Sequence, residues 1–72
     1  MSAPAWRITL DLYRSTWTWT THNPEGGSFG STYCGSKRVA LAQALRGVPI
    51  GAPYTLESLR EGRMVRSEER RA

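Results

Sequence analysis

The sequence predicts a small α+β domain in which a three-stranded antiparallel β-meander packs on one α-helix. Apolar and polar residues alternate with a period of two over residues 6–13 and again over 16–22, which is typical of strands with one buried face. A turn containing Asn, Pro and Gly at residues 23–27 separates these segments from a third strand at 28–34. An Ala-rich segment at 37–46 then has the composition of a helix.

The register of the three strands follows from one assumption about each turn. If Tyr13 faces Thr16 and His22 faces Ser28, both hairpins put the large apolar residues on one face of the sheet. That predicted core face consists of Trp6, Ile8, Leu10, Leu12, Trp17, Trp19, Phe29 and Tyr33. The other face is polar and consists of Arg7, Thr9, Asp11, Tyr13, Thr16, Thr18, Thr20, His22, Ser28, Thr32 and Cys34.

The predicted helix has recognisable start and stop signals. Ser36 is a favourable N-cap, Gly47 fits the position just past the end, and Pro49 prevents continuation. One narrow stripe of the helix and the residues after it is apolar, and we expect this stripe to lie across the aromatic face of the sheet. The stripe consists of Leu41, Ala44, Leu45 and Val48.

The C-terminal third gives weaker signals. Thr55 could cap a short helix over Leu56–Glu61, and Arg63–Arg66 could form a short strand or a second helical piece. The expected element order is therefore β-β-β-α-α. The expected organisation is a flexible N-terminus (residues 1–5), a single small domain (residues 6–61) and a charged, frayed tail (residues 62–72).

Charge and cysteine content narrow the class of partner. The 72 residues include 10 Lys and Arg against 6 Asp and Glu, for a formal net charge of +4. A basic balance favours anionic partners such as nucleic acid. The excess of Arg over Lys is equally well explained by a GC-rich genome. A lone Cys, with no signal peptide and no apolar run long enough for a membrane span, leads us to expect a cytoplasmic protein without a membrane partner.

The sequence contains no arrangement that predicts catalysis. In the predicted register His22 and Cys34 stand six residues apart along the sheet, or ~20 Å, which is too far for a base and a nucleophile. The Gly-rich residues 26–31 precede a strand rather than the helix that a phosphate loop needs. Asp11 and Glu25 do not form a carboxylate pair. We therefore expect no enzyme activity, no catalytic residues, no metal site and no cofactor.

Residues 6–46 resemble the AP2-like DNA-binding domains, including the arm-binding domains of phage-type integrases. The resemblance rests on Trp6-Arg7 at the start of the first strand and on the Gly30-Ser31-Thr32-Tyr33 segment before the Ala-rich helix. Cys34-Gly35-Ser36 departs from the family by an apparent extra residue, and the polar face has fewer cations than such domains usually carry. The resemblance implies duplex DNA binding through the polar sheet face.

The resemblance also implies a set of binding residues. Arg7, Thr9, Thr18 and Thr20 would lie toward the groove, and Arg14, Lys37 and Arg38 toward phosphates. A second explanation stays open for each group. Thr has a high strand propensity and suits any solvated sheet face, and the two cations after Ser36 could be ordinary exposed charges at a helix end.

Two function classes follow from these observations. The first is a small DNA-binding accessory or regulatory protein of phage or mobile-element type, acting through the Thr-rich face. The second is a non-catalytic inhibitor or adaptor that binds a host or defence protein, as an anti-CRISPR does, and strand addition at an exposed sheet edge is one route to such binding. An exposed edge would also allow a homodimer. Steep salt dependence of nucleic-acid binding would separate the two classes.

Overall fold

The three N-terminal strands form with the predicted bounds and register. In the computed structural model, which describes residues 4–72 except the side chains of residues 33 and 34, β1 is Trp6–Tyr13, β2 is Thr16–His22 and β3 is Ser28–Cys34. Tyr13 pairs with Thr16 and His22 pairs with Ser28, which confirms both register assumptions. The expected flexible N-terminus includes residues 1–3, which lie outside the described residues.

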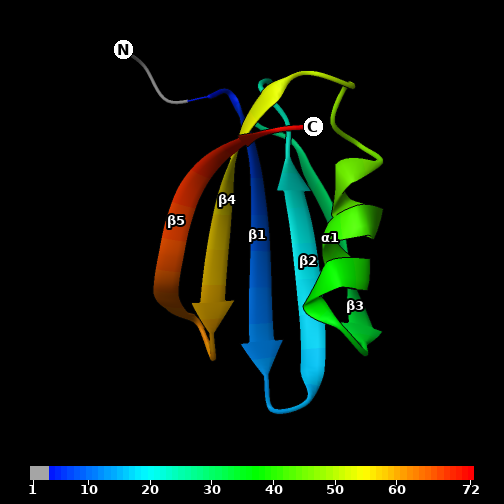
Figure 1. Cartoon of the computed structure of the whole chain (residues 1–72), viewed down its shortest axis with the longest axis vertical. Helices are drawn as coiled ribbons and strands as arrows, with labels where there is room; N and C mark the ends of the chain where they lie inside the picture. Colours follow the sequence, from blue (N-terminus) through cyan, green and yellow to red (C-terminus); the bar gives the residue numbers. More distant parts are fainter. Residues whose placement is uncertain (1–3) are drawn as a thin grey trace.

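The predicted fold class was wrong, because the sheet has five strands rather than three. Two further strands, β4 (Pro53–Arg60) and β5 (Arg63–Arg71), follow the helix. The strand order is β3-β2-β1-β4-β5, and β4 runs parallel to β1 while every other neighbouring pair is antiparallel. Figure 1 shows β1 in the middle of this mixed sheet and β5 at one edge.

The segment that we expected to form a second helix is the strand β4. Buried residues alternate with exposed or half-buried ones along β4. The buried residues are Tyr54, Leu56 and Ser58, and they lie on the same face as the β1 core residues. Pairing with the central strand β1 therefore outweighs the helical spacing of Leu56 and Leu59. The C-terminal tail is likewise not frayed, since residues 63–71 pair with β4 along their length.

A tight turn explains how β5 returns along β4. Glu61 and Gly62 connect the two strands, and both have positive φ angles, 51° and 79°. Positive φ at both central positions is the requirement of a type I′ hairpin turn, which suits the twist of the strands. The β4–β5 hairpin also contains a register irregularity between Ser58 and Leu59.

The helix α1 (Lys37–Leu45) covers one half of one sheet face. Its N-cap is Ser36, whose hydroxyl accepts a hydrogen bond of 3.2 Å from the backbone N–H of Val39, as the sequence predicted. Most of its contacts are with β2 and β1. The core between helix and sheet is formed by Ile8, Leu10, Ala40, Ala44, Val48, Tyr54 and Leu56.

The predicted aromatic core is only partly buried. Trp6, Trp17 and Trp19 pack against the core while staying partly accessible. Phe29 lies on the predicted face of the edge strand β3, next to Gly47 and edge-on to the Trp19 ring with centroids 6.0 Å apart. It is 46% exposed, which corrects its placement in the buried core. The predicted core position of the Tyr33 side chain lies outside the described residues.

The curvature of β5 shapes the helix side of the sheet. Figure 1 shows β5 bending across the sheet so that the C-terminus lies toward the connection between α1 and β4. The backbone of Ala72 fixes this end, donating to Ala52 at 3.0 Å and accepting from Gly51 at 2.8 Å.

Candidate functional site

Four of the predicted binding residues come together on the sheet face opposite α1, here called the open face. Arg7 and Thr9 project from β1, and Thr18 and Thr20 from β2, with Thr9 directly paired to Thr20. The alternation of both strands puts these side chains on the face away from the core. No described element covers this face, so the polar groups on it meet solvent (Figure 1).

The open face contains one hydrogen-bonded network that the sequence did not predict. Glu57 of β4 lies beside β1 because the two strands are parallel neighbours. Its Oε1 accepts a hydrogen bond of 3.2 Å from the Thr9 hydroxyl and forms an ion pair of 3.2 Å with Nη1 of Arg7. The Thr9 oxygen also lies 3.3 Å from Nε2 of His22. Arg7 is therefore partly neutralised before any ligand arrives.

This network sets the protonation of the single histidine. Partial burial of the ring lowers the pKa of His22 below its ordinary value of 6.5. The positive charge of Arg7 lowers the pKa further, and the Glu57 carboxylate acts in the opposite direction. The neutral imidazole is therefore favoured near neutral pH, and His22 adds no positive charge to the open face.

The open face as a whole is not basic. By register it carries three carboxylates, on Asp11, Glu57 and Glu69, against the two guanidinium groups of Arg7 and Arg71. Phosphate binding needs an excess of positive charge. The basic excess of the chain must therefore lie elsewhere on the molecule.

The other three predicted binding residues are not on the open face. Arg14 is in the β1–β2 turn, where its guanidinium carbon lies 5.8 Å from the centre of the Tyr13 ring. Lys37 and Arg38 begin α1, on the opposite side of the sheet, and both are exposed. The Lys37 ammonium lies 5.9 Å from the centre of the Trp17 ring, a core-side residue.

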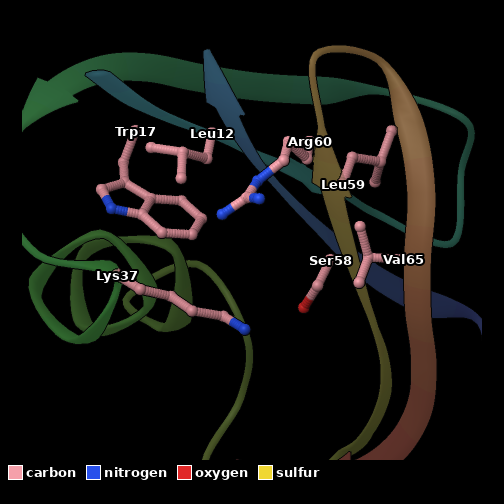
Figure 2. Close-up of a pocket in the computed structure, with 7 residues that line it drawn as sticks. All are labelled: Leu12, Trp17, Lys37, Ser58, Leu59, Arg60 and Val65. Carbon is pink, nitrogen blue, oxygen red and sulfur yellow. The ribbon is translucent and has the colours of Figure 1, made fainter. Parts of the chain in front are cut away.

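Lys37 instead lines a cleft of about 330 Å³ between α1 and the β4–β5 hairpin. We call it the cationic cleft, and its walls include Leu12, Trp17, Lys37, Ser58, Arg60 and Val65. Figure 2 shows Arg60 reaching from β4 toward the Trp17 ring while the Lys37 side chain runs past the same ring from α1. Among the described residues, no carboxylate lines this cleft.

A smaller hollow beside the cleft adds a further cation. It is lined by Leu12, Arg14, Arg60 and Glu61, so Arg60 faces both hollows. This arrangement brings the predicted residue Arg14 to the same end of the molecule as Lys37. Three cations and one carboxylate, Glu61, line the two hollows. A second carboxylate, Asp11, lies nearby and accepts hydrogen bonds from the backbone N–H of Gly62, so the positive excess at this end is one charge.

Sequence reasoning missed Arg60, the residue that completes the cleft. The sequence predicts a helix at Leu56–Glu61, and a helix in that position would not place Arg60 beside β1. The signal that could have found it is the Glu61-Gly62 pair, which marks a hairpin and hence a strand ending at Arg60.

The described part of the chain contains neither a metal-binding cluster nor a membrane-spanning helix. Within it, no group of three His, Cys, Asp or Glu residues could hold a metal ion. None of the helices there is long and apolar enough to cross a membrane. By backbone register His22 and Cys34 stand at opposite ends of the β2–β3 pair, in agreement with the predicted separation.

Comparisons with protein families, with curated proteins and with solved structures find no match to this chain. The resemblance to AP2-like domains therefore stays a hypothesis. Any functional conclusion has to come from the geometry and charge of the two surfaces described above.

Proposed function

We propose that this protein binds nucleic acid, and that the cationic cleft contacts the phosphates. The observation that carries the proposal is the convergence of Lys37 and Arg60 on one cleft that no described carboxylate lines. Lys and Arg side chains are the principal phosphate ligands in nucleic-acid complexes. Converging cations from two separate elements, α1 and β4, would hold a phosphate from two sides.

The charge distribution supports the cleft over the open face as the phosphate-binding surface. On the helix side of β5, Arg66 and Arg70 both form ion pairs with Glu68, at 2.9 Å for Arg66, so these three residues together leave one net positive charge. On the open face Arg7 already has Glu57 as a partner. A phosphate on the open face would have to compete with that carboxylate.

The Thr-rich open face is the alternative surface for the same function. A three-stranded part of the sheet could enter a major groove, with Thr9, Thr18 and Thr20 toward the bases. Both surfaces would serve an accessory or regulatory protein that acts on DNA. An origin in a phage or mobile element rests on the family resemblance alone.

The decisive experiment compares three double variants for binding of labelled 20-mer single strands and duplexes at low salt. We expect Lys37→Gln with Arg60→Gln to weaken binding at least tenfold. The matched control is Arg46→Gln with Arg71→Gln, which removes the same charge from exposed residues outside the cleft. Fluorescence anisotropy gives the affinities, and circular dichroism checks the fold.

The third double variant, Thr18→Glu with Thr20→Glu, separates the two surfaces. Loss of binding in this variant, with binding retained when the cleft cations are removed, would transfer the contact to the open face. Equal weakening in the cleft variant and its charge-matched control would contradict the cleft assignment. No binding of either oligonucleotide by the wild-type protein would reject the function itself.

Protein binding is a second candidate function, favoured by one observation at the β3 edge. Phe29 is 46% exposed on this edge strand, beside a hollow lined by Trp19, Gln43, Arg46 and Gly47. An added strand from a partner could pair with β3 and cover Phe29. Binding of an identified partner that is lost in Phe29→Asp and kept in Lys37→Gln/Arg60→Gln would establish this function.

A further inference from the structure

We infer that the cationic cleft holds one unpaired nucleotide of a single strand, with its base against the apolar wall and its phosphate between Lys37 and Arg60. The inference rests on the proposed function and specifies its ligand. It follows from the combination of groups in the cleft, from the size of the cleft and from comparison with other hollows on the surface.

The cleft combines an apolar wall with cations. Leu12, Trp17 and Val65 supply hydrocarbon and aromatic surface, and Val65 is 68% exposed although it is a β-branched apolar residue. Phosphate recognition alone does not need such a wall. A nucleotide does, because its planar base is largely apolar on its faces and its phosphate is anionic.

The polar groups are distributed as a nucleotide would need them. Figure 2 shows the Arg60 guanidinium beside the Trp17 ring, the Lys37 ammonium in the opening between this ring and Ser58, and the Ser58 hydroxyl pointing into the same opening from β4. Ser58 is only 8% exposed, so little of this residue other than the part that faces the cleft is accessible to a ligand. A hydroxyl can donate to or accept from a base edge, while the two long cations bind the phosphate.

The size of the cleft favours a single strand over a duplex. A volume of about 330 Å³ is near the lower end of small-ligand sites, which are on the order of 300–1,000 Å³. A duplex keeps its bases stacked inside and presents only groove edges and backbone. An unpaired strand can place one base in a concave site without the cost of unstacking a duplex.

Two other hollows lack this combination. The hollow formed by Pro53, Glu69, Arg70 and Arg71 contains a carboxylate and no aromatic ring. The hollow beside Phe29 contains two aromatic rings and one cation, Arg46. The cationic cleft joins two cations and an aromatic ring without a described carboxylate.

The test measures how much of the affinity comes from the base. The full chain is titrated with a labelled oligo-dT 12-mer, an abasic 12-mer with the same phosphates, and a 12-base-pair duplex, all at one salt concentration. We expect the oligo-dT strand to bind at least fivefold more tightly than the abasic strand, which corresponds to the lower end of stacking contributions measured per base. We also expect it to bind more tightly than the duplex.

Two variants assign the base preference to the cleft. Val65→Ser removes part of the apolar wall at an exposed position, so we expect the chain to fold and the ratio of oligo-dT to abasic affinity to fall toward one. Lys37→Gln with Arg60→Gln should lower the affinity for the oligo-dT strand and for the abasic strand by the same factor. In NMR spectra, the indole signal of Trp17 should shift further with oligo-dT than with the abasic strand, whose phosphates still bind beside the ring.

The outcomes separate this inference from the proposed function. Equal affinity for the oligo-dT and abasic strands, or tighter binding of the duplex, would overturn the inference and leave nucleic-acid binding intact. A base preference that Val65→Ser leaves unchanged, with equal Trp17 shifts for the oligo-dT and abasic strands, would also overturn it. Absence of binding to all three probes would reject the proposed function and the inference together.

Discussion

The hydroxyl of Thr21 donates a hydrogen bond of 2.8 Å to the backbone carbonyl of Ala44, and both residues are fully buried. Thr21 lies on β2 and Ala44 in the last turn of α1, so the bond joins helix and sheet inside the core. Carbonyls in the last turn of a helix lack intrahelical partners, and a buried one needs another donor. A polar residue at this core position of β2 is therefore explained by the helix above it.

Thr21→Val should lower the free energy of unfolding by about 0.5–1.5 kcal/mol, the usual contribution of one hydrogen bond. The shape of the side chain is kept, and the Ala44 carbonyl retains only the longer 3.3 Å bond from the N–H of Gly47. Urea unfolding measures the change. Thr20→Val, on the open face, is the control and should change stability by less than about 0.5 kcal/mol. Equal stability of both variants would contradict the assigned role.

Two glycines should differ sharply in their tolerance of a methyl group. A Cβ at Gly47 would overlap the ring of Phe29, whereas a Cβ at Gly30 would overlap the backbone carbonyl of Trp19. Phe29 is exposed and can move, at the expense of its edge-on contact with Trp19, so Gly47→Ala should cost about 0.5–1.5 kcal/mol. The β2 backbone cannot move without breaking strand pairing, so Gly30→Ala should cost more.

Thermal unfolding of the two variants checks this order. Phe29→Ala should also abolish the cost of Gly47→Ala in a double-mutant cycle, since the two changes share one contact. Additive effects, or a larger loss for Gly47→Ala than for Gly30→Ala, would show that the Phe29 ring is not the obstacle.

The pKa of His22 should respond in opposite directions to its two charged neighbours. Burial and the Arg7 charge lower this pKa, and Glu57 raises it. Arg7→Gln should therefore raise the pKa of His22, and Glu57→Gln should lower it further. Because His22 is the only histidine, NMR titration of its ring protons follows the site directly. Shifts of the same sign in both variants would contradict the network.

The same pKa makes stability depend on pH. The unfolded chain binds a proton at His22 near its ordinary pKa of 6.5, and the folded chain binds it only at lower pH. Between these two values the unfolded state holds more protons, so stability is full above about 6.5 and falls as the pH drops toward the folded pKa. His22→Asn should flatten this part of the profile, measured by urea unfolding from pH 7.5 to 5.

The first three strands could be predicted because their alternation is nearly free of exceptions and each hairpin tested the other. β4 could not be predicted with equal ease, since Ser58 occupies a core position and Leu56 and Leu59 have helical spacing. β5 has almost no apolar residues, because it is an edge strand whose charged side chains face solvent on both sides. Its strand conformation comes from pairing with β4 rather than from its own composition.

The candidate site, like the fold, could be predicted only in part. The open-face residues of β1 and β2 could be grouped from the sequence, since they share one hairpin. The cationic cleft could not, because Lys37 and Arg60 come from different elements and meet only through the parallel pairing of β1 and β4. Glu57 reaches Arg7 by the same pairing, so one unpredicted strand both completes the cleft and reduces the positive charge of the open face.

The salt dependence of the binding affinity should show how many phosphates the cleft contacts. For a single strand, the logarithm of the affinity falls with the logarithm of salt concentration with a slope of about 0.7 per phosphate neutralised. Two cations, Lys37 and Arg60, line the cleft directly, and Arg14 lines the adjoining hollow. Lys37→Gln and Arg60→Gln should each reduce the slope by the amount that corresponds to about one phosphate contact. Anisotropy titrations of the oligo-dT 12-mer at four or more salt concentrations give these slopes.

Arg46→Gln is the control for this prediction, because it removes one positive charge at the far end of α1 from Lys37. A general effect of net charge would lower the affinity in all three variants without changing the slope selectively. Direct phosphate contact would lower the slope only when a cleft cation is removed. If Arg46→Gln reduced the slope as much as Arg60→Gln does, phosphates would be neutralised over the whole basic surface, and the cleft would have no special part in binding.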